Sequence, residues 1–172
     1  RGFRVDTREA AERLERIGAE FIGGFNAALM QPEGDALAQS LDERVDPEFR
    51  GFAFEGAAMA LTISDALRLT SGAFNRFAAG PGSAHVYMLF VGAGWAWARL
   101  PWLRFNVESA VSRLDPVTGW LALDGYGFHE GYFHWPASVR RRSVPGWIPP
   151  GYARRAFDQG LGRSLWFVEG LD

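Results

Sequence analysis

Apolar residues recur every three or four positions along most of this chain, which is the spacing of helices that bury one face. In residues 1–31 the apolar positions are Ala10, Leu14, Ile17, Phe21 and Phe25. Thr7 precedes them as an N-cap, and charged residues fill the opposite face. After a turn at 31–34, Asp35 is placed to cap a short helix that reaches about Arg44. The pattern therefore predicts two helices at the start.

The same spacing continues through the middle of the chain. Residues 47–70 predict a third helix, and its small apolar middle places it centrally. A short helix at 71–79 ends at Gly80-Pro81-Gly82, and Ser83 caps another that runs to Arg99 before Pro101. A buried strand is the alternative for residues 86–91, but the alanine-rich continuation favours a helix. Residues 102–114 fit neither pattern.

The segment from Asp115 to Trp135 concentrates histidines, carboxylates, glycines and aromatics. Asp115 and Pro116 form a helix start. The residues that share one helical face are Trp120, Asp124, Gly127, Gly131 and His134. The two glycines predict a groove that a second backbone or a flat ligand could enter. A proline-rich loop is predicted at 136–150 and a last helix at 152–168. The predicted fold is therefore all-α.

We therefore expect one helical domain over residues 1–172, built of packed, glycine-notched helices. A faint repeat is visible in Phe54-Glu55-Gly56, Leu123-Asp124-Gly125 and Phe157-Asp158-Gln159-Gly160, where an apolar residue, a carboxylate and a glycine come together. Val91-Gly92-Ala93-Gly94-Trp95 has the glycines without the acid. Repeat-like helical stacking and chance in a glycine-rich chain both account for it.

Composition excludes several classes of chemistry. There is no cysteine, which removes disulfides, thiolate metal sites and cysteine nucleophiles. All 18 basic residues are arginine, so a lysine Schiff base and a P-loop lysine are also excluded. The net charge of −2 argues against nucleic-acid binding. Serine-nucleophile and dinucleotide-binding motifs do not occur, and no cofactor is favoured.

Two further features bear on location. The longest charge-free apolar run, residues 86–98, is too short to cross a bilayer. The chain starts at Arg1, so we expect a trimmed piece of a longer protein. A cytoplasmic location is expected, with attachment to a membrane surface as the alternative.

Three carboxylates, Glu55, Asp124 and Asp158, lie inside apolar helices, where an unpaired charge costs several kcal/mol. Each therefore needs a partner, and Arg99 and Arg163 are candidates. One interpretation is an internal arginine–carboxylate network. The other is a carboxylate-lined cavity in which one raised pKa provides a general acid.

Glu130 and His134 are four residues apart and could hold a metal from one helical face. His129 lies about 140° around the helix from His134, so we do not expect it to join them. Satisfied or surface histidines are the alternative.

Seven tryptophans and many phenylalanines predict either a large core or a hydrophobic pocket. In the pocket interpretation, Trp95, Tyr126, Phe128 and Trp135 line the cavity. Arg140-Arg141-Arg142, with Arg154 and Arg155, forms a basic patch for an anionic partner such as a carrier protein or membrane, or a solvated loop.

Four separated blocks resemble a bacterial domain of unknown function that is associated with enediyne antibiotic gene clusters. The blocks are Phe49–Leu61, Gly92–Pro101, Asp124–His129 and Arg155–Phe167. Members of that family are longer at both ends, so this chain looks like the N-terminal half. The resemblance carries no catalytic residues. It implies an accessory role beside an iterative polyketide synthase whose product is a linear conjugated polyene.

Three functions remain open at this point. The first is an accessory protein of enediyne or polyketide maturation that binds a hydrophobic polyene or acyl intermediate. The second is a non-enzymatic adaptor that docks on a larger or membrane-associated assembly. The third is a carboxylate–histidine metalloenzyme with non-haem iron or manganese. Whether the protein is an enzyme is not fixed by the sequence.

Overall fold

The computed structural model describes residues 7–100, 102 and 115–169. The α-helices are α1 (Arg8–Met30), α2 (Gly34–Arg44), α3 (Arg50–Ala66), α4 (Ala73–Ala79), α5 (Val86–Arg99), α7 (Leu121–Phe133) and α8 (Tyr152–Glu169). Short turns of 3₁₀ helix, η1 (Ser83–His85) and η3 (Thr118–Trp120), precede α5 and α7. Those ranges contain no strand, which confirms the all-α prediction and the helix at residues 86–91. None of the helices described is long and apolar enough to cross a bilayer.

The helix starts follow the predicted caps only in part. Thr7 caps α1, because its side-chain oxygen accepts a hydrogen bond from the Ala10 N–H at 3.1 Å. Asp35 does not cap α2. That helix already begins at Gly34, and its N-cap residue Glu33 makes no side-chain bond.

The segment after residue 114 also differs in detail from the prediction. Asp115 accepts backbone hydrogen bonds from Val117 and Thr118 at 2.9 and 2.7 Å, which fixes the turn before η3 and not the first turn of α7. The predicted loop at 136–150 contains a π-helical turn, η4 (Pro136–Arg140). Pro101 and residues 103–114 lie outside the described residues.

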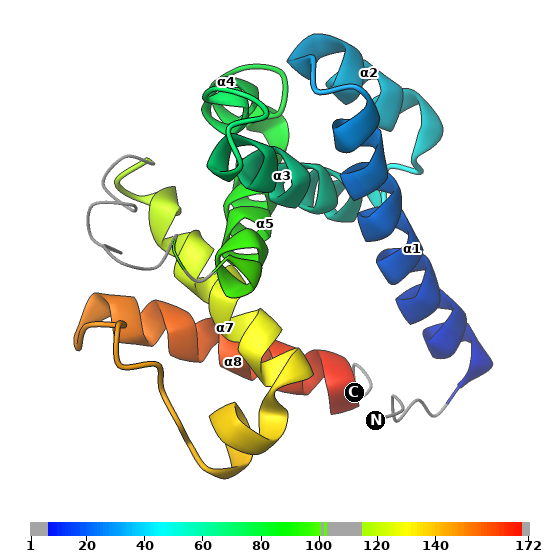
Figure 1. The fold of residues 1–172 in the computed structure, drawn as a ribbon. Coiled ribbons are helices and arrows are strands. Elements are labelled where there is room, and N and C mark those ends of the chain that lie inside the picture. The colour runs from blue at the N-terminus through cyan, green and yellow to red at the C-terminus, as the bar shows by residue number, and fades with distance from the viewer. Residues whose placement is uncertain (1–6, 101, 103–114, 170–172) are drawn as a thin grey trace.

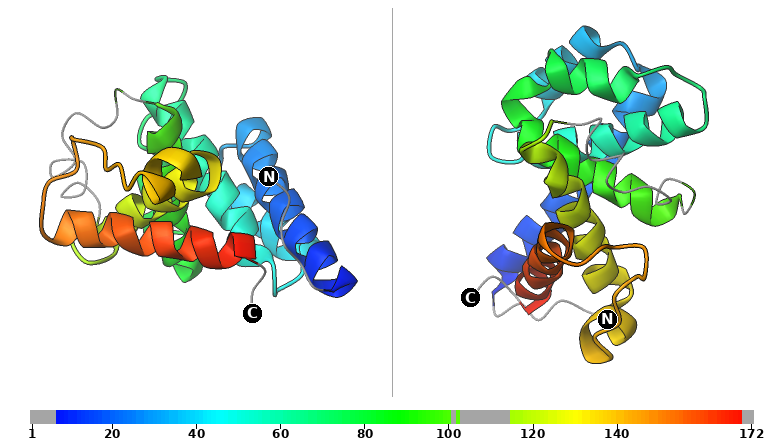
Figure 2. Two further views of the ribbon diagram at one scale, coloured as in Figure 1. Left: turned by 90° about the horizontal axis from the view of Figure 1, so that it is seen from below. Right: turned by 90° about the vertical axis from the view of Figure 1, so that its left-hand side faces the viewer.

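Five helices form one array in which α1, α3, α5, α7 and α8 follow each other, each packed chiefly on the one before and the one after (Figure 1). The short helices α2 and α4 lie at one end of this array, beside α3. Seen from below in Figure 2, the C-terminal part of α8 and the N-terminal part of α1 lie on the same side of the molecule. The array therefore brings its first and last helices near each other.

Each crossing in this array uses the same close contact between a glycine and a backbone carbonyl. A Cβ added at the crossing glycine would lie 1.8–2.1 Å from a carbonyl oxygen of the preceding helix, so only glycine fits. The glycine and carbonyl pairs are Gly56 with Phe21, Gly92 with Glu55, Gly125 with Val91, and Gly160 with Asp124. The positions recur at intervals of roughly 35 residues, as in stacked helical repeats.

A second set of glycines completes three of the crossings from the opposite side. In these crossings, a Cβ added to the glycine would clash with a carbonyl oxygen of the following helix. The glycine and carbonyl pairs are Gly24 with Ala53, Gly94 with Ala122, and Gly127 with Phe157. Because the same register recurs from crossing to crossing, the weak sequence repeat corresponds to repeated packing geometry. The glycine-notched helices expected from the sequence are present, and of the two interpretations of the sequence repeat this packing favours repeat-like stacking.

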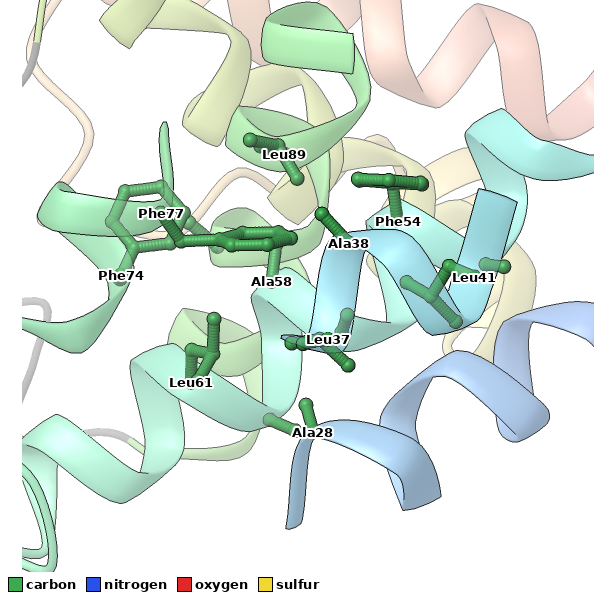
Figure 3. Packing of buried hydrophobic residues seen from close by; sticks show 14 of the residues in the cluster. Ala28, Leu37, Ala38, Leu41, Phe54, Ala58, Leu61, Phe74, Phe77 and Leu89 are labelled. Atoms are coloured by element: carbon green, nitrogen blue, oxygen red, sulfur yellow. The ribbon is translucent and has the colours of Figure 1, made fainter. Parts of the chain in front are cut away.

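Two buried clusters hold the array together. The larger one joins α2, α3 and α4 to parts of α1 and α5, and in Figure 3 Leu37, Phe54, Phe77 and Leu89 converge in it. The second joins the end of α5, α7, the start of α8 and the 144–148 loop around Tyr126 and Phe157. The larger cluster reaches the space between α1 and α8, because Ile17 and Phe52 pack against the cluster and also line that space.

Candidate functional site

A cavity of about 640 Å³ lies where α1 and α8 approach each other, and α3, α5 and α7 form its other walls. Its ionisable lining residues are Arg13, Glu15, Glu55, Arg99, Tyr132 and Arg163. The other lining residues are Leu14, Ile17, Gly18, Phe21, Ile22, Phe52, Met59, Trp95, Phe128, Phe133, Trp166 and Phe167. A volume of this size and a mostly apolar wall are typical of small-molecule sites.

The repeat supplies one wall residue from each of four successive helices. Met59, Trp95, Phe128 and Arg163 each lie three residues after a crossing glycine, and all four line the cavity. Residues three and four apart share a helical face, so the glycine that sets the crossing also sets the direction of these side chains. The cavity is thus the inner face of the helical array.

Glu55 is the buried acid of the cavity, with 6% of its surface exposed. Burial raises the pKa of Glu55 to about 8, because the charged form loses its hydration. Arg163 opposes this shift and Asp124 adds to it. The Trp95 indole also favours the charged form, as a nearby dipole and not as a formed hydrogen bond, since its Nε1 has no partner among the residues that the structure describes. At pH 7 the carboxyl is therefore largely protonated and can donate a hydrogen bond.

Asp124 lies behind the cavity wall and is paired with Arg163, as one of the two interpretations predicted. Arg163 Nε lies 3.1 and 3.2 Å from the two carboxylate oxygens, and its Nη2 contacts Oδ1. The Arg163 guanidinium also lies 5.1 Å from the centroid of the Phe128 ring. This pair joins α7 to α8, and within the described residues the buried Glu55 carboxyl forms no ion pair of its own.

The two partners of this ion pair differ in burial, so their removal should differ in cost. The Asp124 side chain is 2% exposed and that of Arg163 is 42% exposed. We expect Arg163→Met to lower the free energy of unfolding by about 3–5 kcal/mol, since it leaves a buried carboxylate unpaired. Asp124→Asn should cost about 1–3 kcal/mol, because water still reaches the arginine. Urea denaturation measures both, and a larger cost for Asp124→Asn would contradict this assignment.

Three of the predicted site residues lie away from the cavity. Asp158 is not buried: it is exposed on α8, where Arg154 Nε lies 2.8 Å from it, so the expectation of an interior carboxylate was wrong. Tyr126 is part of the second core cluster, with its ring 4.8 Å from that of Trp147. Trp135 lies beside the π-helical turn, where the guanidinium of Arg140 is 6.0 Å from its ring.

The glycine groove expected at Gly127 and Gly131 is occupied by the protein itself. A Cβ at Gly127 would meet the Phe157 carbonyl at 2.1 Å, and one at Gly131 would meet Ser164 Oγ at 1.9 Å. Helix α8 thus fills this groove. The second-backbone alternative is correct here, and no room remains for a flat ligand.

His129, Glu130 and His134 lie together at the C-terminal end of α7, which corrects the expectation that His129 would stay apart. One ligand-type atom from each lies within 4.8 Å of the other two. The reason is that α7 ends at Phe133 and His134 leaves the helical direction, with φ −120° and ψ 27°. Its side chain can then reach Glu130 on the same side as His129.

The charges in this cluster follow from its burial and hydrogen bonds. Burial lowers the pKa of His129, against an opposing contribution from Glu130, while Arg99 lowers it further. For Glu130 burial acts to raise the pKa, but the contacts with His129 and His134 outweigh it and the pKa is lowered. A neutral His129 beside a charged Glu130 is the resulting state near pH 7.

Sequence reasoning did not identify the wall that α1 contributes, nor the wall of α8 beyond Arg163. Phe21 and Ile17 were assigned to the core because their helical spacing is the same for a core face and a cavity face. Ile22, Trp166 and Phe133 are 59%, 57% and 46% exposed, and all three line the cavity. The register of the crossing glycines could have identified Met59, which lies three residues after Gly56 in α3 and was also missed.

Comparison with known proteins adds a family but no relative with an assigned activity. No curated protein and no solved structure matches the chain. The sequence model of a family described as a protein of unknown function, DUF1702, matches residues 1–172. The chain therefore belongs to the DUF1702 family.

Proposed function

We propose that this protein binds an elongated apolar small molecule, such as a linear polyene or an acyl chain, in the cavity between α1 and α8. The observation that carries the proposal is a cavity of about 640 Å³ with an apolar wall and one buried, protonatable carboxyl. Burying a conjugated or saturated chain there contributes roughly 25 cal/mol per Å² of apolar surface removed from water.

Glu55 gives the site its polar contact. With its pKa near 8, the carboxyl is mostly neutral at pH 7 and donates a hydrogen bond to a carbonyl or hydroxyl of the ligand. A neutral donor suits an apolar ligand better than a fixed charge would, because it adds direction without the desolvation cost of an ion. Proton transfer to the ligand is a second use of the same group.

The biological setting that we propose is an accessory step in enediyne or polyketide maturation. It rests on the resemblance of the four sequence blocks and on the volume and mostly apolar wall of the cavity. The exposed Ile22, Phe133 and Trp166 at the cavity also suit an adaptor role, in which a partner protein covers them. Direct binding of a polyene distinguishes the ligand-binding function from the adaptor function, since an adaptor surface does not require a ligand in the cavity.

The test is a fluorescence titration with a conjugated tetraenoic fatty acid, using two matched variants of α1. Gly18 lines the cavity, and a Cβ there has no neighbour within 4 Å, so Gly18→Phe introduces a ring at the cavity wall where the first side-chain atom has room. Gly23 has equal room but does not line the cavity, so Gly23→Phe is the control. The two share the same gain in helix propensity.

We expect binding to the wild-type protein, at least tenfold weaker binding to Gly18→Phe, and unchanged binding to Gly23→Phe. The bulky ring removes volume from the cavity, and an overfilled site rejects a ligand of the same shape. If the tetraenoic acid does not bind, or if both variants bind it as the wild type does, the proposal fails.

A further inference from the structure

We propose that His129, Glu130 and His134 bind one divalent transition-metal ion at the C-terminal end of α7. This site is separate from the proposed apolar-ligand function and does not depend on it. Nδ1 of His129 lies 3.3 Å from Glu130 Oε1, and Nδ1 of His134 lies 3.1 Å from Glu130 Oε2. Ligand atoms around a tetrahedral zinc ion with bonds near 2.1 Å are about 3.4 Å apart. The two histidine–glutamate distances are already close to this value, and the three ligand atoms all lie within 4.8 Å of one another, so a small movement of the exposed His134 ring completes the spacing.

The surrounding contacts hold two of the three ligands in place. His129 is 1% exposed, and its ring lies 5.5 Å from that of Trp95 and 4.8 Å from that of Phe133. Ser138 Oγ donates to the Glu130 carbonyl oxygen at 2.8 Å and lies 3.1 Å from the His134 carbonyl oxygen. These contacts hold the backbone at Glu130 and His134, where α7 ends. Less conformational entropy is therefore lost on metal binding.

The chemistry of the donor set matches a transition metal with an open position. Two imidazoles and one carboxylate are ligands of zinc and of iron(II) sites that keep a coordination place for water. The His134 side chain is 54% exposed, so an ion and its water reach the site from solvent. Arg99 is the nearby cation that opposes binding, and it is exposed, with its guanidinium 5.0 Å from the Phe133 ring.

Isothermal titration of untagged, chelator-treated protein with Zn²⁺ tests this site. We expect one Zn²⁺ per chain for the wild type. His134→Ala and Glu130→Gln should each weaken binding at least tenfold, because loss of even an outer partner of a metal ligand costs 10- to 100-fold. His85 is the third histidine of the chain and lies outside the cluster, so His85→Gln is the matched control and should bind as the wild type does.

The exposed position of His134 keeps the test interpretable, since its replacement leaves the core intact, and circular dichroism checks that each variant is folded. Failure of the wild-type protein to bind Zn²⁺ would overturn the assignment. So would Zn²⁺ binding that His134→Ala leaves unchanged.

Discussion

Gly125→Ala is expected to lower the free energy of unfolding by at least about 4 kcal/mol or to prevent folding altogether. The added methyl carbon would lie 2.0 Å from the carbonyl oxygen of Val91 in α5, where no real Cβ can lie. Backbone atoms of a packed helix cannot move aside as a side chain can, so α5 and α7 must separate. Chemical denaturation followed by circular dichroism measures the loss.

Gly162→Ala is the matched control for this prediction. Gly162 is also a helical glycine, but a Cβ there has no neighbour within 4 Å. Alanine favours helices over glycine by about 0.8–1.0 kcal/mol, so this variant should be slightly more stable than the wild type. If Gly125→Ala instead behaves like Gly162→Ala, the repeated close crossing is not the basis of the array.

Glu55→Gln is expected to remove a large part of the pH dependence of stability. The pKa of Glu55 is about 8 in the folded protein against 4.5 as its ordinary value, so the folded state holds the proton that the unfolded state loses. Stability from this group is fully present below about pH 4.5 and is lost as the pH rises toward 8. The slope approaches about 1.4 kcal/mol per pH unit, and the total loss from pH 5 to 8 is on the order of 3 kcal/mol.

The stabilities of the wild-type protein and Glu55→Gln are best compared between pH 7 and 8. His129 has a lowered pKa, so its contribution has the opposite sign and is lost as the pH falls below about 6.5. Above pH 7 this histidine is mostly neutral in both states and contributes little, and the wild-type protein should lose about 1 kcal/mol that Glu55→Gln retains. Parallel stability profiles for the two proteins over this range would mean that Glu55 is not a buried, protonated acid.

Local patterns were sufficient to predict the helices, because helix formation depends on short-range spacing and caps. Thr7 and the periodic apolar residues of α1 are examples, and the alanine-rich continuation correctly excluded a strand at 86–91. Asp35 was misplaced because a helix start depends on the chain direction at Gly34, which neighbouring residues alone do not fix.

The site was predicted less completely, because it depends on how helices far apart in sequence cross. Glu55, Trp95, Arg99, Phe128 and Arg163 were candidate site residues in the sequence, and all five line the cavity. Asp158 followed the same local pattern as Glu55 but lies on the exposed face of α8, since the repeat places Gln159, not Asp158, beside the crossing glycine. The α1 wall could be recognised only after the crossing register had placed that helix opposite α8.

The central claim is that the inner face of this helical array holds an apolar ligand, and a crystal structure with the conjugated tetraenoic acid tests it most directly. We predict density for the chain between α1 and α8, against Phe21, Met59 and Phe128, with a polar atom within hydrogen-bond distance of Glu55. Density for the ligand only on the outer surface, with the cavity closed by the protein's own side chains, would contradict it.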